Sequence, residues 1–422
     1  MKLNLDRFKE EWKVVGVFYL NTVLVSFAFS LTNMVEFIYI IAIGLSFFQM
    51  GVIWFIFGVI HAVFEIPTGI VADKYGRKLS LLIGLGICGL SYILLPLNEN
   101  FYFVLLFFSL FAFGSTFVSG AGSALKVDYL KHREKKHWIH RVSARSASLG
   151  GLVSVPAALL GAYVLYRFSS GAGVTSGGIM VMKSFFAVHG ILFLISFILF
   201  WLKIDEPPLE STYEGSFIGY VKNIAKKSAD YTLKNRVVLA LYSTIFVFFF
   251  CFVVIQNAWQ PFLVVELNFR LYWLGIIAAL VSFISFLINI KSEDFTEWIG
   301  DYRKTLILLT ILIALAVIAF PTFGRSYGAI GVYILVMAIL SFYKPIRWAY
   351  FAKNIPSEIR ATMSSIDSFI IEMGAGMGSL VLFGAVSEMF SLTFALILSG
   401  VILIPSTILY LLGNNIGKES TL

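Results

Sequence analysis

Long uncharged runs, separated by short charged segments, dominate the pattern of this sequence. Ten runs contain no Asp, Glu, Lys or Arg, and they cover residues 14–35, 37–64, 79–97, 101–125, 146–166, 237–265, 271–290, 305–324, 326–343 and 389–417. A membrane-spanning helix needs about 20 mainly apolar residues, which is close to the length of most of these runs. Two further apolar segments, 183–203 and 361–388, contain only two and three charged residues, respectively.

The run 37–64 is long enough to hold the end of one helix and the whole of the next. We place the turn between them at Gly44, Leu45 and Ser46. With this division the pattern predicts twelve transmembrane helices and an all-α integral membrane protein. Strands of a membrane β-barrel would be about 10 residues long and would alternate polar with apolar positions, unlike these runs.

Composition supports a membrane protein and excludes a water-soluble domain. Hydrophobic residues make up 59% of the chain and charged residues only 13%, against about 25% charged in soluble domains. The twelve-helix topology puts all but four of the 32 Lys and Arg on one side, the exceptions being Arg167, Lys183, Arg270 and Arg325. The positive-inside rule then predicts a multi-pass protein of the inner membrane with both termini cytoplasmic. The net charge of +8 follows from this topology and from contact with membrane lipid, so it implies no nucleic-acid partner.

The charged segment 204–236 divides the chain into a six-helix half at 1–203 and another at 237–422, so we interpret it as a cytoplasmic linker. The halves also resemble each other. An offset of 224 pairs Gly51 with Gly275, Asn33 with Asn257, Glu36 with Gln260 and Glu65 with Asn289. Repeated halves with a site at their interface are typical of secondary transporters.

A short motif lies between the second and third predicted helices. The sequence from Gly69 to Lys78 reads GIVADKYGRK, and it resembles the major facilitator signature G-x-x-x-D-[RK]-x-G-R-[RK]. The residues at its key positions are Gly69, Asp73, Gly76, Arg77 and Lys78.

The resemblance implies the major facilitator fold, with twelve helices in two pseudo-symmetric halves, and it implies that the motif is a gate. In the family, the acid caps a helix of the other half, here the one that starts near Arg360. The arginine pairs with an acid at the end of helix 4, here Asp128. The alternative is that these charges only anchor the topology. Two antiporter motifs of the family are incomplete, because Thr116 and Val155 stand at their Arg and Gly positions.

Polar residues inside predicted helices are candidates for substrate binding, because a polar group in lipid is costly. Helices 1 and 7 line the cavity in this family. We therefore expect five residues to contact substrate: Asn33, Glu36, Gln256, Asn257 and Gln260. Asn33 lies one turn before Glu36, on the same helix face. The alternative is hydrogen bonding between helices.

Four titratable groups at membrane depth are candidates for proton coupling: Glu36, His61, Glu65 and Glu372. His61 and Glu65 are four residues apart and can meet on one face, although His61 can also be structural and Glu65 can simply support the gate. We interpret His189 as a packing residue. Lys344 and Arg347 lie near a helix end, where we expect them to extend toward water.

These observations predict a proton-coupled secondary transporter of a small organic solute that works as a monomer without a cofactor or metal. The FEIPTG-x-x-AD sequence at the entry to the gate motif resembles exporter-like members of the family, which implies export. Proton-coupled uptake and uncoupled facilitation are the alternatives within the class. Other classes are a receptor or scaffold on the same architecture and a membrane-embedded enzyme. His61 and Glu65 lack a second His at the spacing of a H-E-x-x-H metal site, so we do not expect an enzyme.

Overall fold

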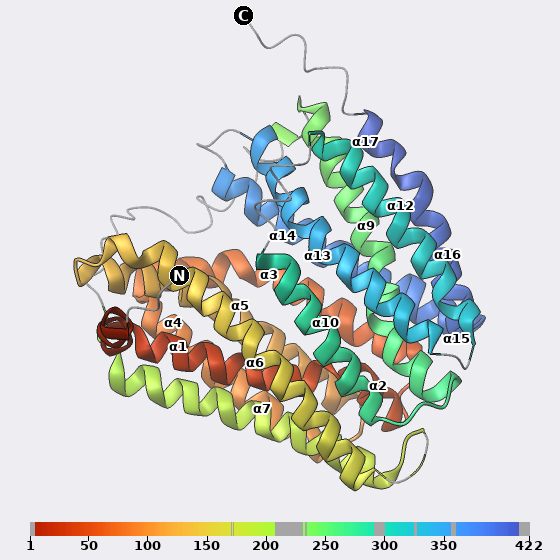
Figure 1. Cartoon of the computed structure of the whole chain (residues 1–422), viewed down its shortest axis with the longest axis horizontal. Coiled ribbons are helices and arrows are strands. Elements are labelled where there is room, and N and C mark those ends of the chain that lie inside the picture. The colour runs from red at the N-terminus through yellow and green to blue at the C-terminus, as the bar shows by residue number, and fades with distance from the viewer. Residues whose placement is uncertain are drawn as a thin grey trace, which may run out of the picture. The chain divides into compact units, whose positions relative to one another are not determined.

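The computed structural model describes residues 5–169, 171, 173–206, 231–232, 234–290, 300–324, 327–355 and 360–412, and these residues are almost entirely helical (Figure 1). The α-helices are α1 Leu5–Asn33, α2 Glu36–Ala42, α3 Phe47–Tyr75, α4 Arg77–Leu94, α5 Phe101–His132, α6 Ile139–Phe168, α7 Ser176–Lys203, α9 Arg236–Pro261, α10 Tyr272–Ile290, α12 Tyr302–Ala319, α13 Gly328–Asn354, α14 Arg360–Gly378, α15 Val386–Met389, α16 Leu392–Ser406 and α17 Ile408–Leu412. Two π-helical segments, η3 Phe262–Glu266 and η5 Ser379–Ala385, extend α9 and α14.

The predicted membrane fold is confirmed. Within the described residues, eleven helices are long and apolar enough to cross a membrane, and a shorter apolar helix at Tyr272–Ile288 lies where the eighth span is predicted. Gly44 has a φ of +90°, a conformation that glycine adopts without strain. It follows α2 and precedes α3, which is where the sequence predicts the turn between the first two spans.

The helices form two compact units. The first unit takes in Met1–Glu36, Phe64–Tyr213 and Leu271–Phe283, and the second takes in Phe37–Val63, Glu214–Arg270 and Ile284–Leu422, each as far as the structure describes those ranges. The units therefore differ from a simple division at the predicted linker. Residues 37–63 pack with the second unit and residues 271–283 with the first, so α3 and α10 each belong to both.

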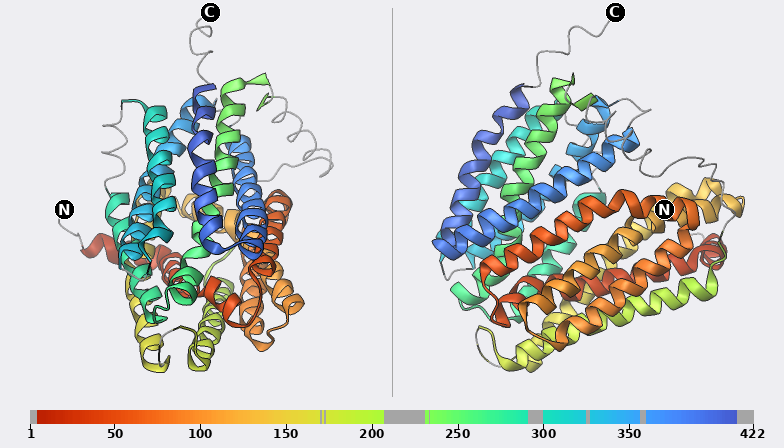
Figure 2. Two further views of the ribbon diagram at one scale, coloured as in Figure 1. Left: turned by 90° about the vertical axis from the view of Figure 1, so that its right-hand side faces the viewer. Right: turned by 180° about the vertical axis from the view of Figure 1, so that it is seen from behind.

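Neighbouring helices within each unit run side by side over most of their length. In the first unit α1 packs on α6 and α7, and α4 packs on α5 and α7. In the second unit α9 packs on α14 and α16, and α12 packs on α13 and α16. Figure 2 shows the long cyan and blue helices of the second unit lying alongside one another.

Side chains in the connecting segments start several of these helices. Asn100, Thr175, Asn235, Asp301 and Ser391 each accept hydrogen bonds from backbone N–H groups in the first turn of α5, α7, α9, α12 and α16, as N-cap residues do. The backbone N–H groups of Lys304 and Arg303 hold the pKa of the Asp301 carboxyl below its usual range.

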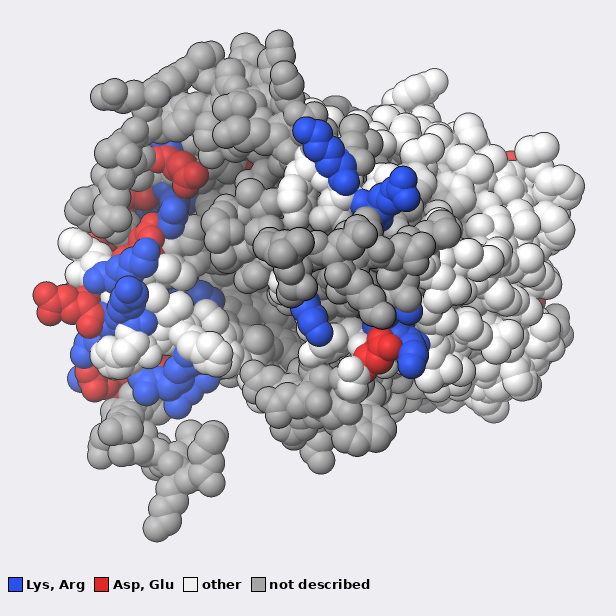
Figure 3. Space-filling model, turned by 90° about the horizontal axis from the view of Figure 1, so that it is seen from above, with Lys and Arg blue, Asp and Glu red and all other residues white. Residues whose placement is uncertain are grey.

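The surface is apolar over wide areas. Met180 is 76% exposed and Leu202 is 66% exposed, in helices that are long enough to span a membrane. Figure 3 shows that on one face the Lys, Arg, Asp and Glu side chains gather in patches, beside broad regions that carry none. Lipid is the solvent that suits such a surface.

Candidate functional site

A glycine turn joins α3 to α4 and positions the signature motif. Gly76 has a φ of +116°, which a residue with a side chain rarely adopts. α3 ends at Tyr75 and α4 starts at Arg77. The turn therefore places Asp73, in the last turn of one helix, close to Arg77, the first residue of the next.

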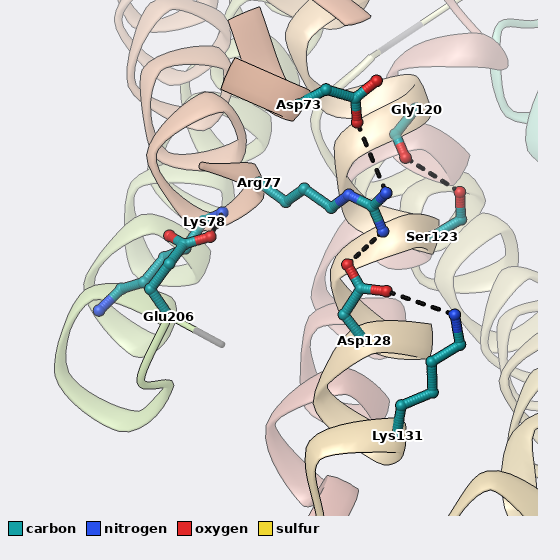
Figure 4. Close-up of polar contacts among 8 residues, drawn as sticks. All are labelled: Asp73, Arg77, Lys78, Gly120, Ser123, Asp128, Lys131 and Glu206. Carbon is teal, nitrogen blue, oxygen red and sulfur yellow. Dashed lines mark hydrogen bonds and ion pairs between the residues drawn. The ribbon is translucent and has the colours of Figure 1, made fainter. Parts of the chain in front are cut away.

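Arg77 lies between two carboxylates (Figure 4). Its Nη1 donates to Oδ2 of Asp128 on α5, and its Nη2 lies 3.5 Å from Oδ1 of Asp73. Lys131 approaches the other oxygen of Asp128 at 4.0 Å. The geometry thus brings together the three charged residues that the motif predicts to interact. Their role as a gate stays a prediction.

Exposure limits how much these ion pairs can stabilise the fold. The side chains of Arg77, Asp128 and Asp73 are 28%, 32% and 65% exposed. Exposed ion pairs contribute about 0–1 kcal/mol to folding, so the cluster is better suited to bias a conformational equilibrium than to hold the protein together. The predicted contact of Asp73 with the helix that starts near Arg360 involves side chains outside the described residues.

Glu36 and Asn33, predicted to share a face, have different surroundings. Glu36 is only 5% exposed, and its Oε1 accepts a 2.8 Å hydrogen bond from the Tyr92 hydroxyl on α4. Asn33, the last residue of α1, is exposed. The chain leaves the helix at Met34 and Val35 before α2 begins, and this break removes the helical spacing on which the prediction depended.

A buried aromatic cluster surrounds Tyr92, the hydrogen-bond partner of Glu36. The Tyr92 ring stacks on Phe111 with a centroid distance of 4.0 Å, and it meets the His189 ring edge-on at 4.5 Å. His189 is fully buried, and its Nδ1 lies 2.9 Å from the Thr32 hydroxyl. His189 therefore packs inside the first unit close to a predicted proton site.

The three polar residues of helix 7 that were predicted to contact substrate differ in burial and in hydrogen-bond partners. Gln260 is buried, and its Oε1 accepts the N–H groups of Phe37 and Ile38 at 3.0 and 3.1 Å, which caps the start of α2. Asn257 is buried and donates to the Ser379 hydroxyl at 3.0 Å. Gln256 is exposed. The two buried residues form the hydrogen bonds between helical segments that were the alternative to substrate contact, which leaves Gln256 the stronger candidate on α9.

The other predicted proton sites lie on α3 and α14. His61 is half-buried and stacks on Phe57 at a centroid distance of 5.3 Å. Glu65 is half-buried one turn further along α3. Glu372 lies on α14 where this helix approaches α3 closely, because a methyl group at Gly58 on α3 would stand 2.8 Å from the Glu372 carbonyl oxygen.

Two glycines that the repeat pairs with each other occupy matching close contacts. A methyl group at Gly51 on α3 would lie 2.5 Å from the carbonyl oxygen of Ser379 in η5. A methyl group at Gly275 on α10 would lie 2.7 Å from the carbonyl oxygen of Ala158 on α6. In both cases any side chain would push the helices apart. The offset of 224 residues therefore pairs positions with the same packing role.

A buried ion pair corrects one prediction. Arg347 on α13 does not extend toward water, because it is only 8% exposed and its Nη1 donates to both oxygens of Asp367 on α14 at 2.7 and 2.9 Å. An arginine is stable at such depth only when a carboxylate compensates its charge. The partner is twenty residues away along the chain, so helical spacing gave no sign of it.

A second buried charge cluster was missed by the sequence reasoning. Glu11 on α1 is fully buried, and its Oε2 lies 2.9 Å from Arg141 Nε and 2.6 Å from Arg145 Nη1 on α6, while Oε1 accepts from the Tyr19 hydroxyl. The four-residue spacing of Arg141 and Arg145 was the available signal, because it places both on one helix face.

We expect Glu11→Gln to destabilise the protein by about 1–3 kcal/mol, since a buried carboxylate that compensates two cations is lost. The arginines are 37% and 34% exposed and can turn to water, which keeps the loss below that of a fully buried pair. Thermal unfolding of the purified full chain checks it. Glu10→Gln is the control, because Glu10 pairs with Lys135 at the surface, and equal effects of both changes would contradict the prediction.

Comparison with known proteins identifies a family that this chain matches. A family model described as Major Facilitator Superfamily matches residues 18–379. An uncharacterized MFS-type transporter of Bacillus subtilis (strain 168), YxaM, is 22% identical over 401 residues, which is 94% of this chain and 95% of that protein.

Solved structures share the fold at low sequence identity. A mutant of the nucleoside transporter NupG has a TM-score of 0.76 at 12% identity, covering 95% of this chain and 100% of that one. A bacterial homologue of the human lysosomal transporter Spinster, in an inward-facing and unoccupied conformation, has a TM-score of 0.71 at 18% identity, covering 95% and 96%.

Proposed function

Because this chain belongs to the major facilitator superfamily, we propose that it is a secondary transporter that exports a small organic solute across the cytoplasmic membrane by alternating access, driven by protons. The observation that carries the proposal is the cluster of Asp73, Arg77 and Asp128 at the α3–α4 turn. Such a cluster costs little to break and remake, which is what a gate requires of its contacts.

The residues take separate roles in this proposal. Gly69, Asp73, Gly76, Arg77, Lys78 and Asp128 form the gate. Asn33 and Gln256 are exposed polar side chains on α1 and α9 and are the first candidates for substrate contact. The buried residues Glu36, Asn257 and Gln260 are the other candidates. Glu36, His61, Glu65 and Glu372 are the candidates for carrying a proton.

Uptake with protons and facilitated diffusion remain the alternatives within the transporter class. Direction and coupling depend on which groups change their protonation during the cycle. The buried position of Glu36 supports coupling over facilitation, because a facilitator has no need of an acid at a depth where its charge is costly.

The test begins with a thermal-shift screen of small solutes on the purified full chain, because a ligand that binds the folded state stabilises it by mass action. A solute that stabilises the protein is then loaded into proteoliposomes. Accumulation inside the vesicles against the solute gradient, when protons are more concentrated inside, supports the proposal. The same accumulation when protons are more concentrated outside would favour proton-coupled uptake. Flux that only dissipates the solute gradient would favour a facilitator, and binding without flux would favour a receptor.

Topology gives an independent prediction. A cysteine at Arg167 should react with an impermeant thiol reagent from outside the cell, and a cysteine at Lys135 only from the cytoplasm. The native Cys88 and Cys251 are buried and should stay silent. Labelling of both positions from the same side would contradict the predicted orientation.

A further inference from the structure

The gate helix α4 begins without a capping side chain of its own. Five other helices start with an Asn, Thr, Asp or Ser that binds first-turn N–H groups, whereas the N-cap of α4 is Gly76. Glycine is required there because φ is +116°, and glycine has no side chain to accept a hydrogen bond. A side-chain cap for the first-turn N–H groups of α4 can therefore come only from another part of the chain.

Glu206 supplies that cap. Its Oε1 accepts the backbone N–H of Lys78, in the first turn of α4, at 2.9 Å. Its carboxyl carbon lies 3.0 Å from where a methyl group on Gly76 would stand, so the absent side chain is what makes room for it. A carboxylate at a helix N-terminus is also favoured by the helix dipole.

A second hydrogen bond fastens the same two segments. The Lys78 side chain donates from Nζ to the backbone carbonyl of Trp201, in the last turn of α7, at 3.2 Å. The start of α4 thus binds both the last turn of α7 and the segment that follows it. Figure 4 shows Glu206 beside Lys78. Ile204 lies between Trp201 and Glu206 in the sequence, and because it is only 2% exposed it anchors this segment.

We propose that Glu206 is the N-cap of the gate and a positioning residue for Arg77, so that this one acid of the predicted linker is part of the gating machinery. Arg77 is the first residue of α4, and it reaches Asp128 from that helix start. Without the cap, the first turn frays and the guanidinium loses its fixed approach to Asp128. This inference rests on the gate of the proposed function.

The experiment uses the full chain in nanodiscs, with Cys88→Ser and Cys251→Ser as background. Glu206→Ala should raise hydrogen exchange of the amides at 77–82 about fivefold, the change expected when a cap is lost. Glu206→Gln should give an exchange rate between those of the wild type and Glu206→Ala, because its amide oxygen still accepts the hydrogen bond but carries no charge. Asp205→Ala is the matched control, since Asp205 is an exposed acid next to Glu206, and it should leave the exchange unchanged.

A double-mutant cycle separates positioning from general stability. With Ser123→Cys on α5 as reporter, Glu206→Ala and Asp128→Asn should each change the rate of thiol labelling in the same direction. The combined variant should add nothing to Asp128→Asn, because both act through Arg77. If the effects of the two changes on the labelling rate add, Glu206 is a structural cap only and the inference is overturned. Unchanged hydrogen exchange in Glu206→Ala would overturn it as well. If Asp73→Asn and Asp128→Asn leave labelling unchanged, the gate assignment itself fails.

Discussion

Asp73→Asn is expected to slow transport at least tenfold while leaving the protein folded and inserted. Asp73 is 65% exposed and lies 3.5 Å from Arg77, so its pair contributes at most about 1 kcal/mol to folding. A gate acts on the balance between two conformations, and a tenfold change in their ratio needs a shift of about 1.4 kcal/mol. That is more than the Arg77 pair alone contributes, and the predicted cap on a helix of the other half supplies the rest. The same charge is therefore minor for stability and large for function.

The measurement compares solute flux in proteoliposomes with the thermal unfolding temperature of the same preparations. Asp73→Glu keeps the charge and should retain a substantial part of the flux, whereas Asp205→Asn removes an exposed acid outside the gate and should keep all of it. Wild-type flux in Asp73→Asn would show that the motif anchors topology only. A large fall in unfolding temperature would instead assign Asp73 a structural role.

The sequence was sufficient for features that depend on local spacing. Twelve apolar runs predict twelve apolar helices because lipid requires each span to satisfy its own backbone hydrogen bonds. The contact between Arg77 and Asp128 was predicted through the signature, whose residues are fixed by one short turn. The pairing of Gly51 with Gly275 was predicted from a repeat, and both positions turned out to lie at close helix contacts.

Contacts between distant segments could not be predicted from the sequence. Arg347 and Asp367 lie on different helices, so nothing in the local pattern of α13 indicated that its arginine would be buried. The same holds for Glu11, which joined a mixed-charge stretch in the sequence but is compensated by two arginines of α6. Glu206 reads as one acid among several in a charged linker, and only the conformation of Gly76 explains why it is needed.

The turn between Asn33 and Glu36 shows how a single local break changes the basis of a functional interpretation. Asn33 and Glu36 share a face only if the helix continues through both, and it does not, because Met34 and Val35 form a turn. Glu36 is buried against Tyr92, whereas Asn33 is exposed. A buried acid can still bind a proton, so the hydrogen bond to Tyr92 is compatible with the proposed role of Glu36 in coupling.

Glu36→Gln is accordingly expected to keep solute binding and abolish the response of transport to a pH gradient. The amide oxygen can still accept the Tyr92 hydroxyl, so the packing is retained, but the side chain no longer titrates. Holding a charge at membrane depth costs about 2.5–3.5 kcal/mol, and protonation removes that cost. A group that gains and loses a proton in different conformations links the two fluxes, because proton and solute then bias the same equilibrium.

Three further variants make this prediction specific. Tyr92→Phe removes the hydrogen-bond donor but leaves Glu36 able to titrate, so it should shift the pH dependence of transport without abolishing coupling. Glu65→Gln and Glu372→Gln test the other two acids, and each should keep coupling if Glu36 carries the proton alone. The measurement is solute accumulation in proteoliposomes at a fixed pH gradient, with binding followed by thermal shift. If Glu36→Gln, Glu65→Gln and Glu372→Gln each still concentrate solute under a proton gradient, none of these acids is indispensable. A carrier driven in another way then becomes the better interpretation.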